Sequence, residues 1–352
     1  MLHMNEWRWS HFIRSFNGAH LLIVEPEFER RLLQHGVPHN CDFTSPNKLQ
    51  EIDLTPFERI LVFSFEREQE IIDQLKAAHP KKIIASGTYE FSMVGADRKP
   101  RLLLKRREPR PANKGPVVLI ATPNSDAEYT AQVMGGNDLP VPWEYIGRPF
   151  ISLCELKPDI DFQRLIEVAV KRHASDEGMA YLFHTDVLEA LFKHTALTLD
   201  VFAAWLREQN ARLIVQRRND KYTQAYLCGQ LKSTFTRSLW NMPKRKKFTF
   251  KNNISHATHI LGALDHMRRG EVMLNDIATA HDNAYEMILE DILEDVPGHV
   301  AKIAAHINEK RTDISDVLDY TSCEELTPGL SEVVSEYKRE LVDRIGAGAA
   351  IL

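Results

Sequence analysis

Short apolar runs alternate with amphipathic stretches over the first hundred residues of the chain. The runs His20–Val24, Arg59–Phe65 and Lys82–Ser86 are typical of buried strands. Stretches with helical spacing follow the first two, at Glu27–Gln34 and Glu66–Ala78. Strands and helices that alternate in this way form parallel sheets with right-handed crossovers. The pattern predicts a small Rossmann-like α/β domain, to which we assign no dinucleotide because it has no GxGxxG turn.

A second α/β unit follows Lys105–Pro116, a segment whose content of proline and charge is typical of a linker. Its strand-like runs include Val117–Ala121 and Arg212–Val215, and a long helical pattern covers about Ser255–Ala280. Apolar positions from Leu330 to Ile345 lie on one helical stripe, which packs on the chain's own core or, in a homo-oligomer, on a second copy. The predicted parts are an N-terminal domain, a linker, a second domain and a helical tail, at 1–105, 106–115, 116–310 and 311–352.

The composition of the 352 residues is that of a globular protein, with 43% hydrophobic and 26% charged residues. It excludes a disordered chain, a collagen-like fibre and a disulfide-dense scaffold. The 4 cysteines form no CxxC pair and predict free thiols in a reducing compartment. No apolar stretch approaches the roughly 20 residues that span a bilayer. We therefore expect a cytoplasmic protein without a membrane span.

Positive charge is concentrated in one part of a chain whose net charge is only −5. Residues 212–251 contain eleven Lys or Arg and one acid, a local charge of +10. Such a block favours an anionic ligand held at one place, although a solvated basic surface has the same composition. Cations alternate with aromatic rings in Lys244–Lys251, so a nucleic-acid-binding role for this segment is a further, less favoured alternative.

The sequence after Val117–Ala121 predicts a strand-to-helix turn, with the helix beginning near Glu128. In such a turn, backbone N–H groups and the positive end of the helix dipole point to the same spot. That arrangement binds phosphate or sulfate. It is not a nucleoside-triphosphate loop, because GxxxxGK[ST] and its lysine are absent, and a kinase or ATPase is not favoured.

A second motif follows the strand that begins at Arg212. Its R-x-D-x-x-x-Q-A spacing consists of Arg218, Asp220, Gln224 and Ala225, with Trp240 further along the chain. This pattern resembles the second motif of the bacterial trehalose sulfotransferase family. Three other elements resemble motifs of that family and occur in the family's order along the chain. Ala121–Ser125 resembles its TPRSGS loop, Pro142–Tyr145 its P-x-E-[FY] element, and Glu290–Ile292 its closing Y-E-D-L element. The resemblance covers about Pro116–Asn308.

The resemblance implies a sulfotransferase fold, a P-loop NTPase-like parallel sheet flanked by helices. It also implies transfer of a sulfuryl group from 3′-phosphoadenosine 5′-phosphosulfate (PAPS) to a hydroxyl of a carbohydrate or glycolipid, without a metal. Arg218 would then bind the 3′-phosphate, and Glu144 would be the general base. The loop that would hold the 5′-phosphosulfate consists of Thr122, Pro123, Asn124, Ser125, Asp126 and Ala127.

The chain departs from the family pattern within this loop. The family's loop arginine is Asn124 here, its glycine is Asp126, and the following serine or threonine is Ala127. Asp126 and Glu128 put two negative charges where a dianion would bind. The alternative function is therefore a catalytically inactive or re-purposed binding protein with the same fold.

Other charged and histidine side chains lie close to these motifs in the sequence. Arg217, Lys221 and Lys232 supply positive charge close to Arg218 in the sequence and can compensate for the lost loop arginine. His184 lies near Asp186, but side chains this close on one element rarely face each other usefully. We therefore expect no catalytic role for that pair.

Overall fold

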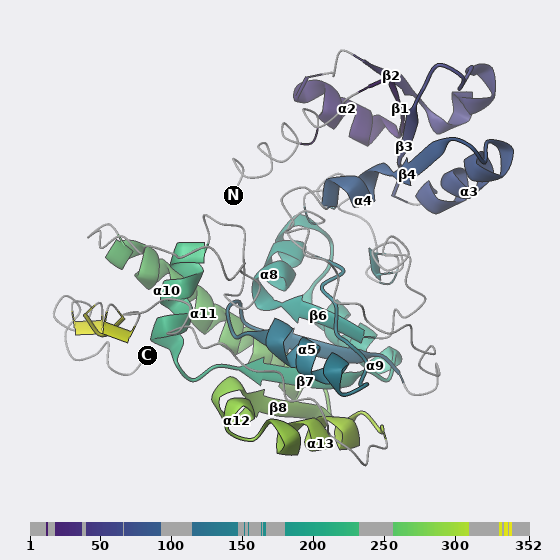
Figure 1. The fold of residues 1–352 in the computed structure, drawn as a ribbon. Helices are drawn as coiled ribbons and strands as arrows, with labels where there is room; N and C mark the ends of the chain where they lie inside the picture. Colours follow the sequence, from purple (N-terminus) through teal and green to yellow (C-terminus); the bar gives the residue numbers. More distant parts are fainter. Residues whose placement is uncertain are drawn as a thin grey trace. The chain divides into compact units, whose positions relative to one another are not determined.

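The computed structural model contains two compact units, one formed by 1–103, 145–176 and 190–198, the other by 104–144, 177–189 and 199–352 (Figure 1). Each unit has a four-stranded parallel sheet with flanking helices, which confirms the predicted α/β class. The structure describes residues 12, 18–36, 40–65, 67–92, 115–146, 151, 154, 163, 165–166, 180–231, 256–309, 331–332, 334–336 and 338–339.

The sheet of the first unit has the strand order β2-β1-β3-β4, with every pair parallel. The three strands predicted from apolar runs are present, whereas β2 was not predicted because its sequence, CDFT, has no apolar run. The elements are β1 (His20–Val24), α2 (Pro26–Gln34), β2 (Cys41–Thr44), the 3₁₀ helix η1 (Pro46–Glu51), β3 (Arg59–Phe63), α3 (Glu68–Ala78), β4 (Ile83–Ser86) and α4 (Gly87–Ser92).

Helices α2 and α3 cover opposite faces of this first sheet. Ile71 and Leu75 of α3 join a buried cluster with Leu21 of β1. On the other face, the ring of Phe28 in α2 lies 5.8 Å from that of Phe63. Both faces of the central strands are therefore buried, which explains why β1 and β3 are nearly continuous apolar runs.

The sheet of the second unit has the order β6-β5-β7-β8, again all parallel. The elements are β5 (Val117–Ala121), α5 (Ala127–Gly136), β6 (Ala180–His184), α8 (Thr185–His194), α9 (Leu199–Glu208), β7 (Arg212–Arg217), α10 (Lys221–Leu231), α11 (His256–Thr279), β8 (Ala284–Ile288), α12 (Leu289–Glu294) and α13 (Val296–His306).

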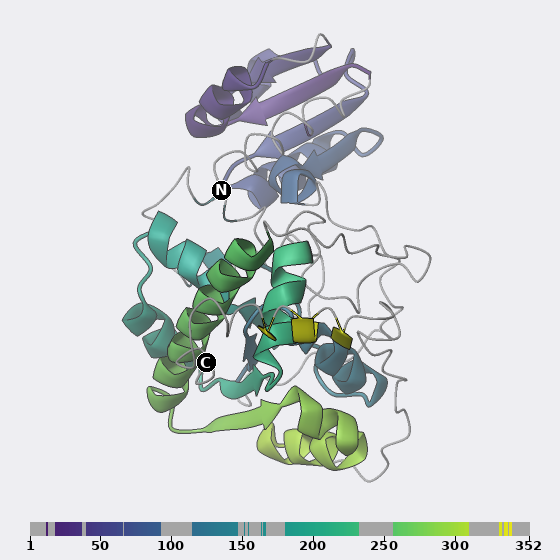
Figure 2. The same ribbon diagram turned by 90° about the vertical axis from the view of Figure 1, so that its left-hand side faces the viewer.

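Two groups of helices enclose this second sheet. Helices α5, α12 and α13 share one buried cluster with the residues of β5 that alternate from Val117 to Ala121. Helix α9 covers the other face, where Phe202 and Trp205 contact the rings of Phe183 and Tyr181. Helices α10 and α11 lie side by side, and Figure 2 shows them on the opposite side of the sheet from α5.

This strand order creates a topological switch point between β5 and β7. The chain leaves β5 towards α5 on one face of the sheet and leaves β7 towards α10 on the other. In open parallel sheets, ligands bind in the crevice that opens at the carboxyl ends of two such strands. The two sequence motifs, after Ala121 and after Arg217, both lie at this point.

Several predicted features lie outside the described residues, among them 106–114 of the linker, Trp240, and Lys244–Lys251. The described part of the predicted tail, 331–332, 334–336 and 338–339, is helical. Within the part of the chain that the structure describes, no helix is both long and apolar enough to cross a membrane.

Candidate functional site

The loop after β5 is a buried, tightly folded turn. Thr122, Asn124, Ser125 and Asp126 are all at most 3% exposed. Asn124 and Asp126 have left-handed backbone conformations, with φ values of 58° and 53°. Asn and Asp tolerate this region better than other side chains, although glycine is favoured there. Asp126 therefore has a backbone conformation that favours glycine, the residue that the sulfotransferase resemblance predicts at this position.

Two glutamines fix the shape of this loop. Gln216 of β7 donates from Nε2 to the carbonyl of Ser125 at 2.6 Å. Gln224 of α10 donates to the Thr122 hydroxyl and to the Pro123 carbonyl, both at 2.7 Å. Gln224 belongs to the second sequence motif, so one function of that motif is to hold the first.

Arg218 joins the loop directly. Its Nη1 donates to the Asn124 carbonyl at 3.3 Å and lies 3.4 Å from Oδ2 of Asp126. Both side chains of the ion pair are buried, with exposures of 8% and 3%. The structure therefore brings the predicted phosphate-binding arginine to the predicted phosphosulfate loop, and it pairs that arginine with one of the two loop acids.

The second acid, Glu128 in the first turn of α5, also has a basic neighbour. Its Oε1 lies 3.3 Å from Nε2 of His184, a fully buried side chain at the end of β6. Burial alone would lower the pKa of His184, but the negative charges of Glu128 and Asp186 outweigh it, so the pKa is raised. From the sequence we expected no catalytic role for His184 and Asp186 and did not anticipate Glu128, which reaches His184 from α5 and which no local pattern signals.

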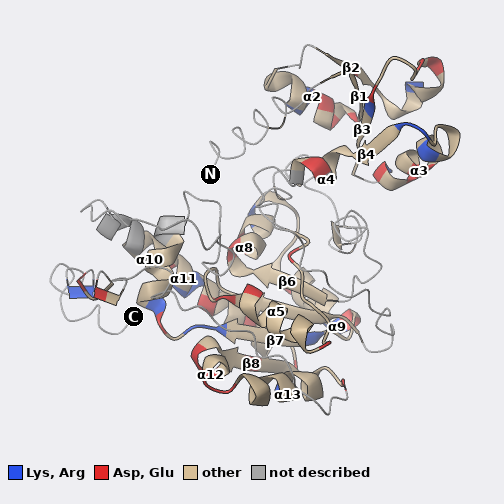
Figure 3. Ribbon diagram, viewed as in Figure 1, with Lys and Arg blue, Asp and Glu red and all other residues tan. Residues whose placement is uncertain are grey.

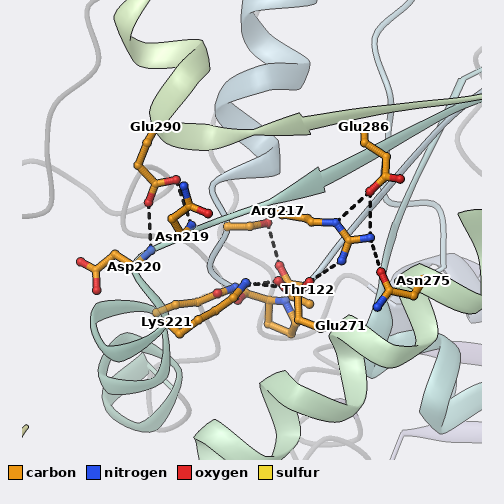
Figure 4. Close-up of polar contacts among 12 residues, drawn as sticks. Thr122, Arg217, Asn219, Asp220, Lys221, Glu271, Asn275, Glu286 and Glu290 are labelled. Carbon is orange, nitrogen blue, oxygen red and sulfur yellow. Dashed lines mark hydrogen bonds and ion pairs between the residues drawn. The ribbon is translucent and has the colours of Figure 1, made fainter. Parts of the chain in front are cut away.

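The first turn of α10 is held by two carboxylates. Asp220 of the second motif accepts from the Thr223 amide at 3.0 Å and caps the helix. Glu290 accepts from the amides of Asn219 and Asp220 at 3.0 and 3.1 Å (Figure 4). Glu290 was matched above to the closing family element without a role; its position in the first turn of α12, two residues after β8, was the available signal.

Helix α11 is tied to the same edge of the sheet by an ion-pair cluster (Figure 4). Arg217 donates from Nη1 to Glu271 at 2.5 Å and from Nη2 to Glu286 and Asn275 at 3.0 and 2.8 Å. Lys221 pairs with the other oxygen of Glu271. Arg217 and Lys221 therefore face α11, and the expected compensating charge beside Arg218 is matched by acids.

Gly270, the residue before Glu271, allows α11 to approach the strand ends closely. A Cβ atom at this position would lie 2.7 Å from Oγ1 of Thr185 and 2.9 Å from Cγ2 of Thr122. The glycine that breaks the apolar pattern of this helix is thus required by packing.

Glu144 lies at the outer side of β6. Trp143 pairs with Tyr181, with its amide donating to Ala180 at 3.3 Å and its carbonyl accepting from Leu182 at 2.7 Å. Strand β6 therefore separates Glu144 from β5, across about 10 Å of sheet at the usual strand spacing. The structure joins Arg218 to the loop and places Glu144 on the far side of β6.

Among the described residues at this edge, acids outnumber the cations of Arg217, Arg218 and Lys221; they are Asp126, Glu128, Asp220, Glu271, Glu286 and Glu290. Figure 3 shows basic residues at the end of β7 and the start of α10, with acidic segments of α11 and α12 nearby. Of the eleven basic residues in 212–251, the structure describes Arg212, Arg217, Arg218 and Lys221. Within the described residues, no group of three or more His, Cys, Asp or Glu side chains is arranged to hold a metal ion.

Comparisons of the chain with models of known protein families, with curated proteins and with solved structures gave no match.

Proposed function

We propose that the chain is a sulfotransferase-like protein that binds PAPS at the carboxyl ends of β5 and β7 and transfers its sulfuryl group to a carbohydrate or glycolipid hydroxyl. The observation that carries this proposal is the contact of Arg218 with the loop after β5, across 92 residues of sequence. The loop and the arginine were matched separately to two family motifs. They meet at the switch point, where a parallel sheet of this kind binds its ligands.

Each residue has a physical role in this proposal. The guanidinium of Arg218 suits a phosphate dianion, and the loop lies at the positive end of the ten-residue helix α5. When bound, PAPS supplies an activated sulfuryl group whose S–O bond to the nucleotide breaks as a bond to the acceptor oxygen forms. Glu144 would take the proton that the acceptor hydroxyl loses, with the acceptor bound on the β6 side of the loop.

The ion pair between Arg218 and Asp126 limits this binding. A phosphate must displace the carboxylate of Asp126, 3.4 Å from the guanidinium, before it can contact the arginine directly. This exchange weakens binding by the free energy of the buried pair. The pairing also supports a second function, a binding protein with the same fold and no transfer activity, because Asp126 and Glu128 satisfy Arg218 and His184 without a ligand.

Calorimetric titration with adenosine 3′,5′-bisphosphate tests the site. We expect Arg218→Ala to weaken binding by about 10- to 100-fold, because it removes charge-assisted hydrogen bonds worth roughly 1.5–3 kcal/mol. Asp126→Asn should strengthen it, because the competing carboxylate is neutralised. Arg212→Ala is the matched control, an arginine at the opposite end of the same strand, and should leave affinity unchanged.

Thermal unfolding of each variant separates lost binding from lost structure, and the double variant Arg218→Ala/Asp126→Asn removes the pair without leaving a buried charge. Absence of binding at millimolar ligand in both the native protein and Asp126→Asn would overturn the proposed site.

Sulfation of a panel of sugar acceptors with PAPS tests the transfer step. We expect Glu144→Gln to lower kcat by at least 100-fold without weakening binding of the bisphosphate, because general base catalysis contributes about that factor. Glu294→Gln, on the exposed surface of α12, is the control. Bisphosphate binding without sulfation of any acceptor would favour the second function.

A further inference from the structure

Two cations on different elements hold one carboxylate from a third element at the edge of the second sheet. Arg217 ends β7, Lys221 begins α10, and Glu271 belongs to α11. Each carboxylate oxygen takes one cation, Oε2 from Arg217 at 2.5 Å and Oε1 from Lys221. All three side chains are about one fifth exposed, at 18%, 23% and 20%. We call these three residues the α11 clamp.

The geometry points to Arg217 and Lys221 as an anion subsite for a phosphate or sulfate group. In the structure, where α11 packs against the edge of the sheet, Glu271 occupies the position of that group. The nature of the ligand as a nucleotide rests on the proposed function. The exchange of Glu271 for an anion is a separate claim, and inorganic phosphate suffices to test it.

Position supports the subsite. Arg217 directly precedes Arg218, whose guanidinium contacts the loop after β5. Gly270, next to Glu271, packs on Thr122 of the same loop. The clamp therefore lies at the switch point, where displacement of Glu271 would make Lys221 and one edge of Arg217 available to an anion.

The contacts of Arg217 also suit an exchangeable partner. Its Nε and Nη2 donate to Glu286 of β8, both at 3.0 Å, and this anchor lies within the sheet. Its Nη1 faces Glu271, which comes from a helix outside the sheet. Movement of α11 would therefore break the contacts of Arg217 with Glu271 and Asn275 and leave the guanidinium held by Glu286 of β8, with its Nη1 edge directed to an incoming anion.

The same edge already contains two other carboxylates on groups that bind anions. Asp126 forms an ion pair with Arg218, and Glu290 accepts hydrogen bonds from the amides at the start of α10. Of these three acids, Asp126 belongs to the loop after β5, Glu290 to the short helix α12 and Glu271 to α11. Because α11 packs on α10 and on the end of β7, we expect displacement of Glu271 to shift α11 against both.

The test compares the native protein with Glu271→Gln and with Asp265→Asn. Asp265 pairs with Arg269 on the same helix, away from the clamp, and is the matched control. In calorimetric titrations with inorganic phosphate, we expect Glu271→Gln to raise the affinity about tenfold, because the competing carboxylate has lost its charge. Asp265→Asn should not change it. Adding Lys221→Gln to Glu271→Gln should abolish the gain.

Amide hydrogen exchange gives a second readout that does not depend on Glu271→Gln gaining affinity. Phosphate added to the native protein should speed exchange in α11 and slow it at the start of α10. Unchanged phosphate affinity in Glu271→Gln, or slower exchange throughout α11 in the native protein, would overturn the subsite. The proposed function fails by a different result, bisphosphate binding that Arg218→Ala leaves intact.

Discussion

At the switch point of the first sheet, the residue after β1 is Glu25, whose carboxylate accepts from the Ser64 hydroxyl at 2.5 Å and from the Phe65 amide at 3.3 Å. At the switch point of the second sheet, Arg218 after β7 donates to the loop after β5. The two sheets have the same order, with the first strand between the second and the third. The carboxylate of Glu25 reaches across the crevice in the first unit, and the guanidinium of Arg218 does so in the second.

This difference shows how little the topology alone determines. The strand order provides a crevice in both sheets, but the side chains decide which ligand the crevice accepts. In the first unit, the donors that an anion would need are taken by Glu25, and the carboxylate would repel a second negative group. In the second unit, the crevice contains a cation, Arg218, which pairs with Asp126 of the loop. The proposed function therefore places its anionic ligand in the second unit.

The largest effect on stability is expected from adding a side chain where α11 packs closely against the second sheet. Gly270→Val should destabilise the second unit by about 3 kcal/mol, because its Cβ would overlap Thr185 and Thr122. Gly262→Ala is the control on the same helix, where no atom lies within 4 Å, and should stabilise by up to about 1 kcal/mol. Amide exchange resolved by segment measures both, and equal effects in β1 and β5 would contradict the assignment of this contact to the second unit.

A smaller effect is expected at the first switch point. Glu25→Ala should cost about 1–3 kcal/mol of stability, because the Ser64 hydroxyl and the Phe65 amide lose their acceptor. Urea denaturation followed by segment-resolved exchange should place the loss in β1 and β3. Bisphosphate affinity should stay at the native value, and a change comparable to that in Arg218→Ala would show that the two crevices are not distinct in function.

The smallest effect is a pH dependence at the opposite edge of the second sheet. Burial, together with the charge of Arg212, lowers the pKa of His306 below its ordinary value of 6.5, although its hydrogen bond to Leu213 opposes this shift. The unfolded chain then binds the proton more readily, so stability is full above pH 6.5 and falls as pH decreases through that value. Denaturation at a series of pH values should show that the free energy of unfolding depends less steeply on pH in His306→Gln than in the native protein. An unchanged slope would remove His306 as its source, and His79→Gln, exposed in the first unit, is the control.

Local patterns were sufficient for much of the fold. Val117–Ala121 was predicted with the bounds that β5 has, because a central parallel strand is buried on both faces and its sequence is continuously apolar. Strand β2 was missed because it lies at the edge of its sheet and Asp42 is exposed. Helix α11 was expected at about 255–280 and spans His256–Thr279, and its buried positions include the small residues Ala263 and Gly270. Small residues lie inward there because the helix approaches the sheet closely.

The candidate site was predictable only in part. The turn after Ala121 and the arginine after β7 could be identified because each belongs to a local motif. Their partners could not, since the pairs of Arg218 with Asp126 and of Arg217 with Glu271 join residues 92 and 54 positions apart. Such contacts depend on strand order and helix packing, which no local pattern encodes. The contacts of these carboxylates with the basic residues could therefore not be predicted from the sequence.

The two glutamines that brace the loop after β5 have a consequence for how the site responds to its solvent. Gln216 and Gln224 hold the loop through neutral hydrogen bonds, at 2.6 and 2.7 Å, that neither protonation nor dissolved ions alter directly. The cations around the loop are held by ion pairs, and those of the partly exposed α11 clamp weaken as ionic strength rises. The part of the loop from Thr122 to Ser125 is thereby held independently of the exposed charges, whereas Asp126 is held by its buried ion pair with Arg218. A change in salt would then alter how strongly the edge attracts an anion while the turn that receives it keeps its form.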